Sequence, residues 1–234
     1  LEHPGLVADI HLPHLGPEIM VIKLQVVQIA VGKVVDTHDL IAALPGETPA
    51  SLAAGLERLP ARRPHDTHIE VLNRLRGTAI TRFDSEWNMR YNPQPPYELL
   101  HHRTMSPEDL SAIKRFARAW DLWVNSGNFV ATAARLWRNA PSTYQSFSQW
   151  SDWAFTRLGR QHALSLEQQA DTLFHYLVNE NHQPANEVAA DLIRDYRRAG
   201  RRETPAFLQA FPQPADARLP EPRPWPVILR RQLR

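Results

Sequence analysis

The stretch DLIAALPGETPASLAAGLERL, from Asp39 to Leu59, decides the fold of the first part of the chain. Its opening apolar run, Asp39 to Leu44, suits a buried strand, and the Pro-Gly dipeptide that follows predicts a turn. Thr48 followed by Pro49 is typical of a helix N-cap and first helical position, and leucines at helical spacing continue to Leu59. The stretch therefore predicts a strand, a turn and a helix in that order.

A further strand is predicted shortly after this helix. In THIEVLNRL, apolar Ile69 and Val71 alternate with Glu70, which favours a strand over His68 to Asn73. A strand, a helix and a strand at this spacing predict a parallel βαβ unit. Before it, the Val- and Ile-rich MVIKLQVVQIAVGKVV predicts one or two buried strands within residues 1–35, with Gly32 as a turn between them.

The remaining chain changes character twice. Residues 76–105 are rich in turn residues and proline, and we expect a long connecting loop there. From Ser106 the apolar spacing becomes helical, and helices are expected from Ser106 and over 129–139, 142–158, 165–179 and 184–199. The predicted class is α+β, mainly α, with a βαβ region at 1–80, a loop at 81–105, a helical domain at 106–200 and a Pro- and Arg-rich tail at 201–234. Seven prolines from Thr204 to Arg234 favour an extended or disordered tail.

Composition excludes several classes of chemistry. The 234 residues contain no cysteine, so this chain forms no disulfide, zinc ribbon, cysteine nucleophile or cysteine-ligated iron–sulfur cluster. No apolar run approaches the roughly 20 residues that a membrane-spanning helix needs. Because the chain starts at Leu1 and shows no leader pattern, we expect an excised or incomplete piece of a cytoplasmic protein. The net charge is +2, and ten arginines against four acids lie in residues 194–234.

Side chains that often carry catalysis show no diagnostic spacing. The histidines form three close pairs, but none lies at i, i+4 on a convincing helix with a carboxylate behind it, so no metal site is predicted; the pairs are His11 with His14, His65 with His68, and His101 with His102. No Gly-x-Ser-x-Gly elbow occurs, and no catalytic residue is assigned. The helical register of Trp120, Trp150 and Trp153 favours core packing over stacking on a ligand.

The two predicted parallel strands both end in compact polar turns. Parallel sheets bind ligands at the carboxyl ends of their strands, and LPGE, residues 44–47, lies at such an end before a helix N-terminus. The second strand ends in NRLRGT, which brings Arg74, Arg76, Gly77 and Thr78 to the same rim. Glycines there either serve a ligand or only form tight turns, and the spacing alone leaves both interpretations open.

Four segments taken in order resemble one known family. They are DLIAALPGETPASLAAGLERL, HIEVLNRLRGTAITR, YNPQPPYELL and IKRFARAWDLWVNSGNF. This ordered set, over residues 36–180, is similar to the end of the catalytic barrel and the C-terminal helical domain of cobalamin-binding radical S-adenosylmethionine proteins. The resemblance implies that Ile41, Ala43, Leu44 and Glu47 flank the adenosine moiety of S-adenosylmethionine and that Arg76, Gly77 and Thr78 close over it. The family has glycine at the position of Ala43.

The resemblance also implies what this chain lacks. The family ligates a [4Fe–4S] cluster through a Cys-x3-Cys-x2-Cys loop, and this chain has no cysteine. We therefore expect an inactive C-terminal fragment with a remnant of the (β/α) barrel, whose complete relative would use S-adenosylmethionine, the cluster and cobalamin. Its expected partner is the missing N-terminal half of the same enzyme, and neither a membrane nor nucleic acid is expected. Residues 1–35 do not follow the family pattern, because only five residues separate Ala30 from Asp36, too few for an intervening helix. The alternative is a stand-alone helical interaction module whose Arg-rich tail binds an acidic partner or nucleic acid.

Overall fold

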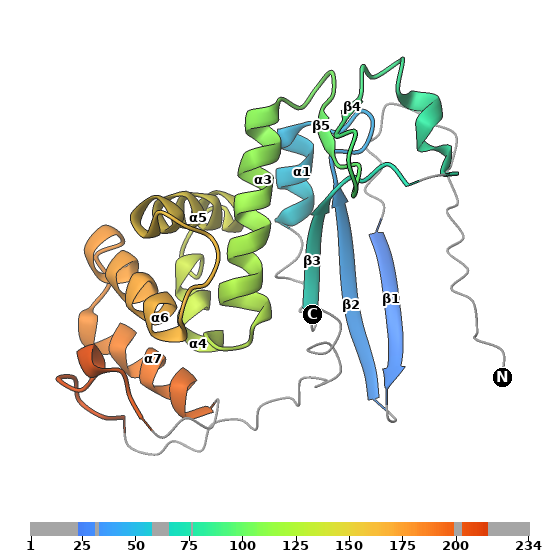
Figure 1. The fold of residues 1–234 in the computed structure, drawn as a ribbon. Coiled ribbons are helices and arrows are strands. Elements are labelled where there is room, and N and C mark those ends of the chain that lie inside the picture. Colours follow the sequence, from blue (N-terminus) through green and yellow to red (C-terminus); the bar gives the residue numbers. More distant parts are fainter. Residues whose placement is uncertain (1–22, 31–32, 58–65, 76, 199–202, 215–234) are drawn as a thin grey trace.

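A computed structural model describes residues 23–30, 33–57, 66–75, 77–198 and 203–214. Its main sheet has three strands in the order β1 (Lys23–Ala30), β2 (Lys33–Ala42) and β3 (Asp66–Val71). β1 pairs antiparallel with β2, whereas β2 pairs parallel with β3, which places Ile41 opposite Glu70 (Figure 1). The predicted parallel unit is therefore confirmed, and β1 adds an antiparallel strand at the other edge of β2.

The strand boundaries differ from the prediction. The expected strand at Asp39–Leu44 is the second half of β2, which begins at Lys33 and ends at Ala42. The valines before Asp39 therefore continue this strand instead of forming a separate one. Residues 43 and 44 already belong to the turn, because Ala43 has a left-handed backbone with φ of 69°.

Helix α1 (Pro49–Leu56) connects the two parallel strands. Thr48 caps it as predicted: its Oγ1 accepts the Ser51 N–H at 3.1 Å, while Ser51 Oγ accepts the Thr48 N–H at 2.9 Å. This reciprocal pair is a capping box, which satisfies backbone donors that the first helical turn leaves free. The helix ends at Leu56, and the predicted end at Leu59 lies outside the described residues.

The segment expected as a plain loop contains short regular elements. It includes the 3₁₀ helix η1 (Ala79–Phe83) and the antiparallel strands β4 (Arg90–Tyr91) and β5 (Leu99–His101). Leu99 donates its N–H to the Leu72 carbonyl at 2.9 Å, so this segment also pairs with the chain just after β3. The prediction of an irregular loop missed these elements because such pairing depends on a neighbouring strand, which local composition does not report.

The helical domain follows the predicted order. Its elements are α3 (Pro107–Trp120) with a π-helical turn η2 (Asp121–Asn125), α4 (Val130–Ala133) with the 3₁₀ helix η3 (Ala134–Leu136), α5 (Thr143–Leu158), α6 (Leu166–His175) with a π-helical turn η4 (Tyr176–Glu180), and α7 (Ala185–Arg198). Gly159 ends α5 in a left-handed conformation, as expected. Together with the small sheets, these helices confirm an α+β protein that is mainly α. Among the described residues no helix is both long and apolar enough to cross a membrane.

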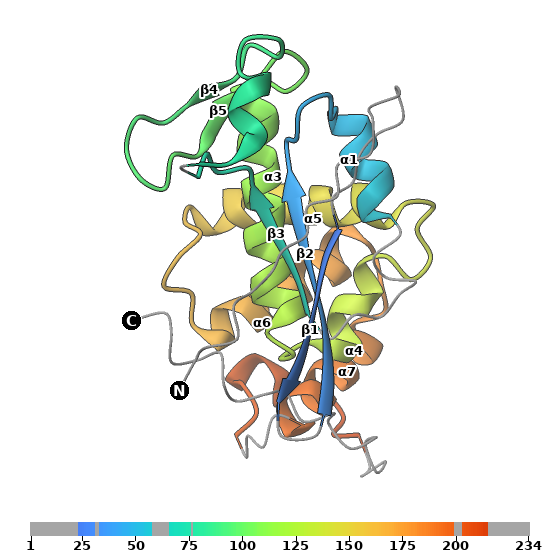
Figure 2. The same cartoon turned by 90° about the vertical axis from the view of Figure 1, so that its right-hand side faces the viewer.

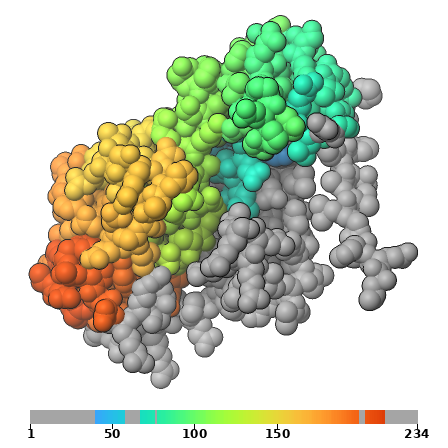
Figure 3. All heavy atoms as spheres, in the orientation of Figure 1, coloured from blue at the N-terminus to red at the C-terminus, as the bar shows by residue number. Residues whose placement is uncertain are grey.

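The α-helices lie on one side of the main sheet, with α1 and α3 next to it (Figures 1 and 2). In Figure 3 helices α5 to α7, in yellow to red, lie at one end and the blue-green segment with η1, β4 and β5 at the other. Aromatic rings fill the helical core, where Trp123 packs edge-on against Trp150 with 5.0 Å between the ring centroids. Trp120 is buried while its neighbours Arg118 and Asp121 are half-buried, as the periodicity predicts.

Part of the predicted tail packs onto this domain. Residues 206–208 form the 3₁₀ helix η5 (Ala206–Leu208), and Leu208 is fully buried. Phe207 and Phe211 contact the Phe174 ring, with centroid distances of 5.6 and 5.4 Å. The expectation of an extended or disordered segment is therefore wrong for 204–214, because Phe207, Leu208 and Phe211 are apolar anchors among the prolines. The rest of the tail, 215–234, lies outside the described residues.

Candidate functional site

The turn after β2 has two residues with a left-handed backbone. The Glu47 N–H donates to the Leu44 carbonyl at 2.9 Å across Pro45 and Gly46, and Gly46 has φ of 84°. Proline in second place and a positive φ in third fit a type II turn. Ala43, just before the turn, also has a positive φ of 69°, a conformation that glycine adopts with less strain. The sequence motif is thus a tightly specified backbone turn.

The Glu47 side chain holds this turn from inside. Glu47 is only 4% exposed, and its Oε2 accepts the N–H of Ala43 at 2.6 Å and that of Leu44 at 3.3 Å. Burial raises the pKa of Glu47 above the ordinary value of 4.5, and these two N–H groups counteract the rise. Since Oε2 is engaged by the backbone, Glu47 acts here as a positioning residue.

A second layer covers the turn. A Cβ at Gly46 would lie 3.3 Å from Cη2 of Trp87, so the indole packs directly on the glycine. Thr104 Oγ1 donates to the Glu47 carbonyl at 2.6 Å. Ala43, Leu44 and Glu47 are consequently buried beneath residues that follow β3 in the sequence.

His102 lies beside Thr104 in this layer. Its Nδ1 accepts the Thr104 N–H at 3.2 Å, which leaves the proton of the neutral ring on Nε2. Burial, and to a smaller extent the charge of His101, lower the pKa of His102, so the ring is neutral at pH 7. The backbone of Ala43 raises the pKa of His102, although Nε2 has no partner at hydrogen-bonding geometry among the described residues. The histidine pairing in the sequence did not reveal this buried position.

The turn after β3 is more open. Gly77 is exposed with φ of 80°, and Thr78 is half-buried and donates from Oγ1 to the Leu75 carbonyl at 2.7 Å. Ile41, near the end of β2, is half-buried, and Arg76 lies outside the described residues. Parallel pairing therefore brings the ends of β2 and β3 to one edge, but the predicted residues divide into a buried group after β2 and a more exposed group after β3.

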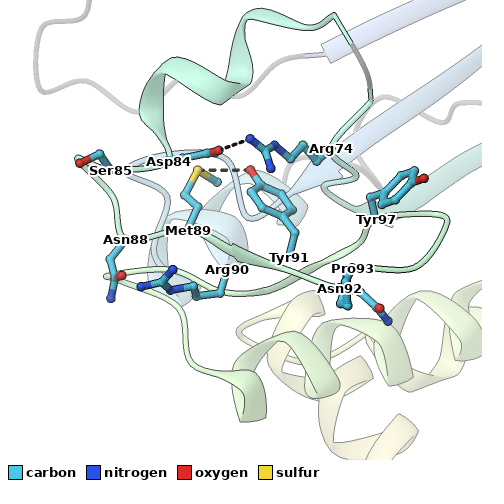
Figure 4. A pocket seen from close by; sticks show the side chains of 10 residues that line it. All are labelled: Arg74, Asp84, Ser85, Asn88, Met89, Arg90, Tyr91, Asn92, Pro93 and Tyr97. Carbon is cyan, nitrogen blue, oxygen red and sulfur yellow. Dashed lines mark hydrogen bonds and ion pairs between the residues drawn. The ribbon is translucent and has the colours of Figure 1, made fainter.

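A cavity of about 750 Å³ lies next to the end of β3. We call it the Arg90 cavity; its lining residues are Arg74, Asp84, Ser85, Asn88, Met89, Arg90, Tyr91, Asn92, Pro93 and Tyr97 (Figure 4). Sequence reasoning assigned no role to most of these residues. Arg74 was predicted at the rim of the sheet, and the four lining residues from Tyr91 to Tyr97 lie in YNPQPPYELL, which contributed to the resemblance but contains no recognised binding motif.

The ionisable groups of the Arg90 cavity are ordered by one another. Arg74 pairs with Asp84 at 2.7 Å, and its guanidinium carbon lies 5.5 Å from the centroid of the Tyr91 ring. Tyr91 donates its hydroxyl to Met89 Sδ at 3.4 Å. Burial and, secondarily, the charge of Asp84 raise the pKa of Tyr91 to about 12, while Arg74 opposes the rise. Tyr91 is therefore a neutral hydroxyl group at physiological pH.

No metal centre accompanies these features in the described part of the chain. No three or more His, Asp or Glu side chains there gather in a way that could hold a metal ion. The described geometry consists of a rigid turn, an open turn beside it and a polar cavity.

The fold and the site define an α+β protein in which a parallel βαβ unit with two specialised turns is joined to a helical domain. A family model described as "Protein of unknown function (DUF4080)" matches residues 85–218. The chain therefore belongs to the DUF4080 family, and the match covers the β4–β5 segment, the helical domain and the docked residues after it. No curated protein and no solved structure matches the chain.

Proposed function

We propose that this chain supplies the last two parallel strands of the catalytic barrel and the C-terminal helical domain of a cobalamin-binding radical S-adenosylmethionine protein. One observation carries the proposal. Turns with left-handed backbone follow the neighbouring parallel strands β2 and β3 at the same edge of the sheet. That edge is where parallel sheets bind ligands, and both turns lie in motifs that resemble the family.

The geometry gives the motif residues different roles in this proposal. Ile41, Gly77 and Thr78 are the members that a nucleoside could reach, whereas Glu47 acts through the backbone of the preceding turn. The family has glycine at the position of Ala43, and the positive φ of Ala43 accounts for that preference. The Ala43 methyl group is fully buried, so it does not occupy the side that a ligand would approach.

The residues of this chain do not fit the iron–sulfur cluster, since no cysteine is present. In this superfamily bound S-adenosylmethionine is the source of a 5′-deoxyadenosyl radical, and the reducing cluster would have to come from another polypeptide segment. The chain alone offers two strand ends and no cluster anchor. A loss of about 4 kcal/mol weakens affinity roughly a thousandfold, so we expect no saturable S-adenosylmethionine binding by the chain alone at micromolar concentrations.

The β1 hairpin matters for any complementing segment. β1 pairs antiparallel along β2, on the edge where a barrel would place a parallel strand. A complementing half would therefore have to displace β1. A variant lacking residues 1–32 exposes that edge of β2 and should complement better than the whole chain.

The test is co-expression with a polypeptide that carries the cobalamin-binding domain, the Cys-x3-Cys-x2-Cys loop and the first four barrel strands of a member of the superfamily. The expected result is a one-to-one complex on gel filtration and formation of 5′-deoxyadenosine after anaerobic reduction. Glu47→Ala should abolish the product, and Glu86→Ala, at an exposed position of the covering segment, should not. Reading the coding sequence upstream for a Cys-x3-Cys-x2-Cys loop is an independent check.

Two results would contradict the proposal. One is the lack of any complex with either the whole chain or the variant that lacks residues 1–32. The other is a complex that forms 5′-deoxyadenosine equally well when Glu47 is replaced by alanine. Tight binding of S-adenosylmethionine by the chain alone would show a working nucleoside site and would refute the dependence on a second polypeptide.

A further inference from the structure

Residues 102–105 hold the layer that covers the turn after β2. His102 and Met105 exchange both backbone hydrogen bonds, at 3.1 Å from the His102 N–H and at 3.3 Å from the Met105 N–H. Thr104, between them, donates its hydroxyl to the Glu47 carbonyl at 2.6 Å. This short, closed segment is therefore fastened to the turn beneath it through one side chain.

Trp87 is attached to the same segment. The Arg103 N–H donates to the Trp87 carbonyl at 2.8 Å, and the Trp87 indole packs on Gly46. A displacement of residues 102–105 would therefore also pull on the residue that covers the glycine. We call Trp87 together with residues 102–105 the cover.

The closed cover requires a neutral ring at His102. The side chain is buried, with only 4% of the residue exposed, and its Nδ1 accepts the Thr104 N–H at 3.2 Å. An imidazole nitrogen accepts a hydrogen bond only where it carries no proton. Nε2 has no hydrogen-bond partner among the described residues. The ring thus has one contact that depends on its protonation state and no described acceptor for the other N–H group.

Protonation of His102 is incompatible with this arrangement. A proton on Nδ1 turns the acceptor of the Thr104 N–H into a donor, so that two donors face one another. The Thr104 hydroxyl oxygen, 3.3 Å from Nδ1, can accept the new proton, but a hydrogen bond of that length is weak. The ring would also carry a buried charge without full hydrogen bonding, which is costly. A charged His102 therefore favours a state in which the cover has left the turn.

The positive groups near His102 increase this effect. Burial lowers the pKa of His102, and the charge of His101, its neighbour on β5, lowers it further. Arg103, the next residue, is exposed and carries a charge of the same sign. Neither neighbour compensates a buried imidazolium.

Two carboxylates belong to the other elements that pack here. Glu47 lies in the turn beneath, where its Oε2 accepts the N–H groups of Ala43 and Leu44. Glu86 lies beside the uncharged Trp87 and is exposed. Burial and the neighbouring histidine, not an ion pair with either carboxylate, determine the direction of the pKa shift of His102.

We propose that the cover is operated by a proton: it is closed on the turn after β2 while His102 is neutral, and it opens and exposes Ala43, Leu44 and Glu47 when His102 is protonated. The inference concerns the chain by itself and does not depend on the proposed barrel function. It makes access to the end of β2 sensitive to pH.

The test is amide hydrogen exchange of the whole chain, followed by NMR from about pH 7 to about pH 5, the range in which histidine titrates. Because the closed state lowers the pKa of His102 below 6.5, the closed cover is fully stable above pH 6.5 and loses stability as the pH falls. Protection of the Thr104, Ala43 and Leu44 amides, corrected for intrinsic exchange, should fall by up to roughly tenfold per pH unit, because opening takes up one proton. The fall should level off below the pKa that the His102 ring resonances give in the same samples.

Low concentrations of urea distinguish opening of the cover from unfolding of the chain. A local opening exposes little surface, so urea should hardly change exchange at Thr104. It should speed exchange strongly at Leu173, which is fully buried in the helical core.

Two variants locate the titrating group. In His102→Asn the amide oxygen can still accept the Thr104 N–H but does not titrate, so Thr104 protection should change less than twofold over this pH range. His101→Asn is the matched control. It removes the charge that lowers the pKa of His102, so the loss of protection should remain and move to higher pH.

Glu47 acts with the opposite sign in this experiment. Its raised pKa means that the closed state binds the carboxyl proton more tightly, so its protonation stabilises the closed cover as the pH falls. The pH series is therefore repeated in Glu47→Gln, which should show the full slope. Three results would overturn the proposal: Thr104 protection that does not depend on pH in this background, the same pH dependence in His102→Asn, or a urea dependence at Thr104 equal to that at Leu173.

Discussion

Replacement of Glu47 by alanine should destabilise the whole fold, because this carboxylate is the internal support of the turn after β2. Its Oε2 accepts backbone N–H groups at 2.6 and 3.3 Å, and both donors belong to buried residues. Alanine leaves these donors without that acceptor. A buried donor that loses its partner costs about 1 to 3 kcal/mol.

The net effect is smaller than the sum of two such losses. The longer bond of 3.3 Å is weak, so its loss belongs at the lower end of that range. Burial of the carboxylate is itself unfavourable, as the raised pKa of Glu47 shows, and removing it recovers part of that energy. We expect a loss of about 2 to 3 kcal/mol in the free energy of unfolding, or a change of about 30- to 150-fold in the folded-to-unfolded ratio.

Urea denaturation followed by tryptophan fluorescence measures this change. Trp87 packs on the same turn, and several buried tryptophans report on the helical core. The matched control is Glu86→Ala, an exposed glutamate whose loss should change the free energy by less than about 0.5 kcal/mol. If Glu47→Ala loses no more than this control, the carboxylate does not support the turn and the reasoning is refuted.

The pH dependence of the same position follows from the direction of its pKa. Because the folded-state pKa of Glu47 is raised above 4.5, the folded chain binds the proton more tightly than the unfolded chain. The stability from this group is complete below pH 4.5 and is lost as the pH rises through the folded-state value. Glu47→Gln does not titrate, so wild type should lose stability relative to this variant as the pH rises from 4.5. A constant difference across that range would contradict the pKa shift.

Two further substitutions test other parts of the fold. Gly46→Ala should lower the free energy of unfolding, measured by urea denaturation, by more than Gly77→Ala. Both glycines have a positive φ, where a side chain costs about 1 to 2 kcal/mol. Only at Gly46 would the new Cβ also meet a neighbour, Cη2 of Trp87 at 3.3 Å. Equal losses would mean that the indole yields freely. Asn125→Ala should cost about 1 to 2 kcal/mol and speed hydrogen exchange at the Thr67 amide, because the Asn125 side chain pairs with both the N–H and the carbonyl of Thr67. Unchanged exchange at Thr67 would show that the helical domain does not protect this strand.

Local patterns were sufficient for the elements whose cause is local. The capping box at Thr48 and the glycine stop at Gly159 follow from side-chain chemistry within a few residues, and both are confirmed. The parallel pairing of β2 with β3 followed from the length of the connection between them. These features need no knowledge of distant contacts.

Features that depend on distant contacts were missed. The pairing of Leu99 with Leu72 and the docking of Leu208 on the helices join segments far apart in the sequence. At the candidate site, the motif predicted the turn after β2, but not that Trp87 and Thr104 cover it. Sequence reasoning therefore recognised the rim of the sheet more readily than the Arg90 cavity beside it.

The edge of β3 that faces away from β2 explains why sheet and helices form one unit. Near its start, Thr67 pairs with the side-chain amide of Asn125, at 3.3 Å through its N–H and 2.8 Å through its carbonyl. Beyond its end, Asn73 forms an isolated antiparallel bridge with Glu98. Asn125 reaches the strand from the π-helical turn that extends α3. The helical domain thus covers the edge of the three-stranded sheet that β3 would otherwise leave open.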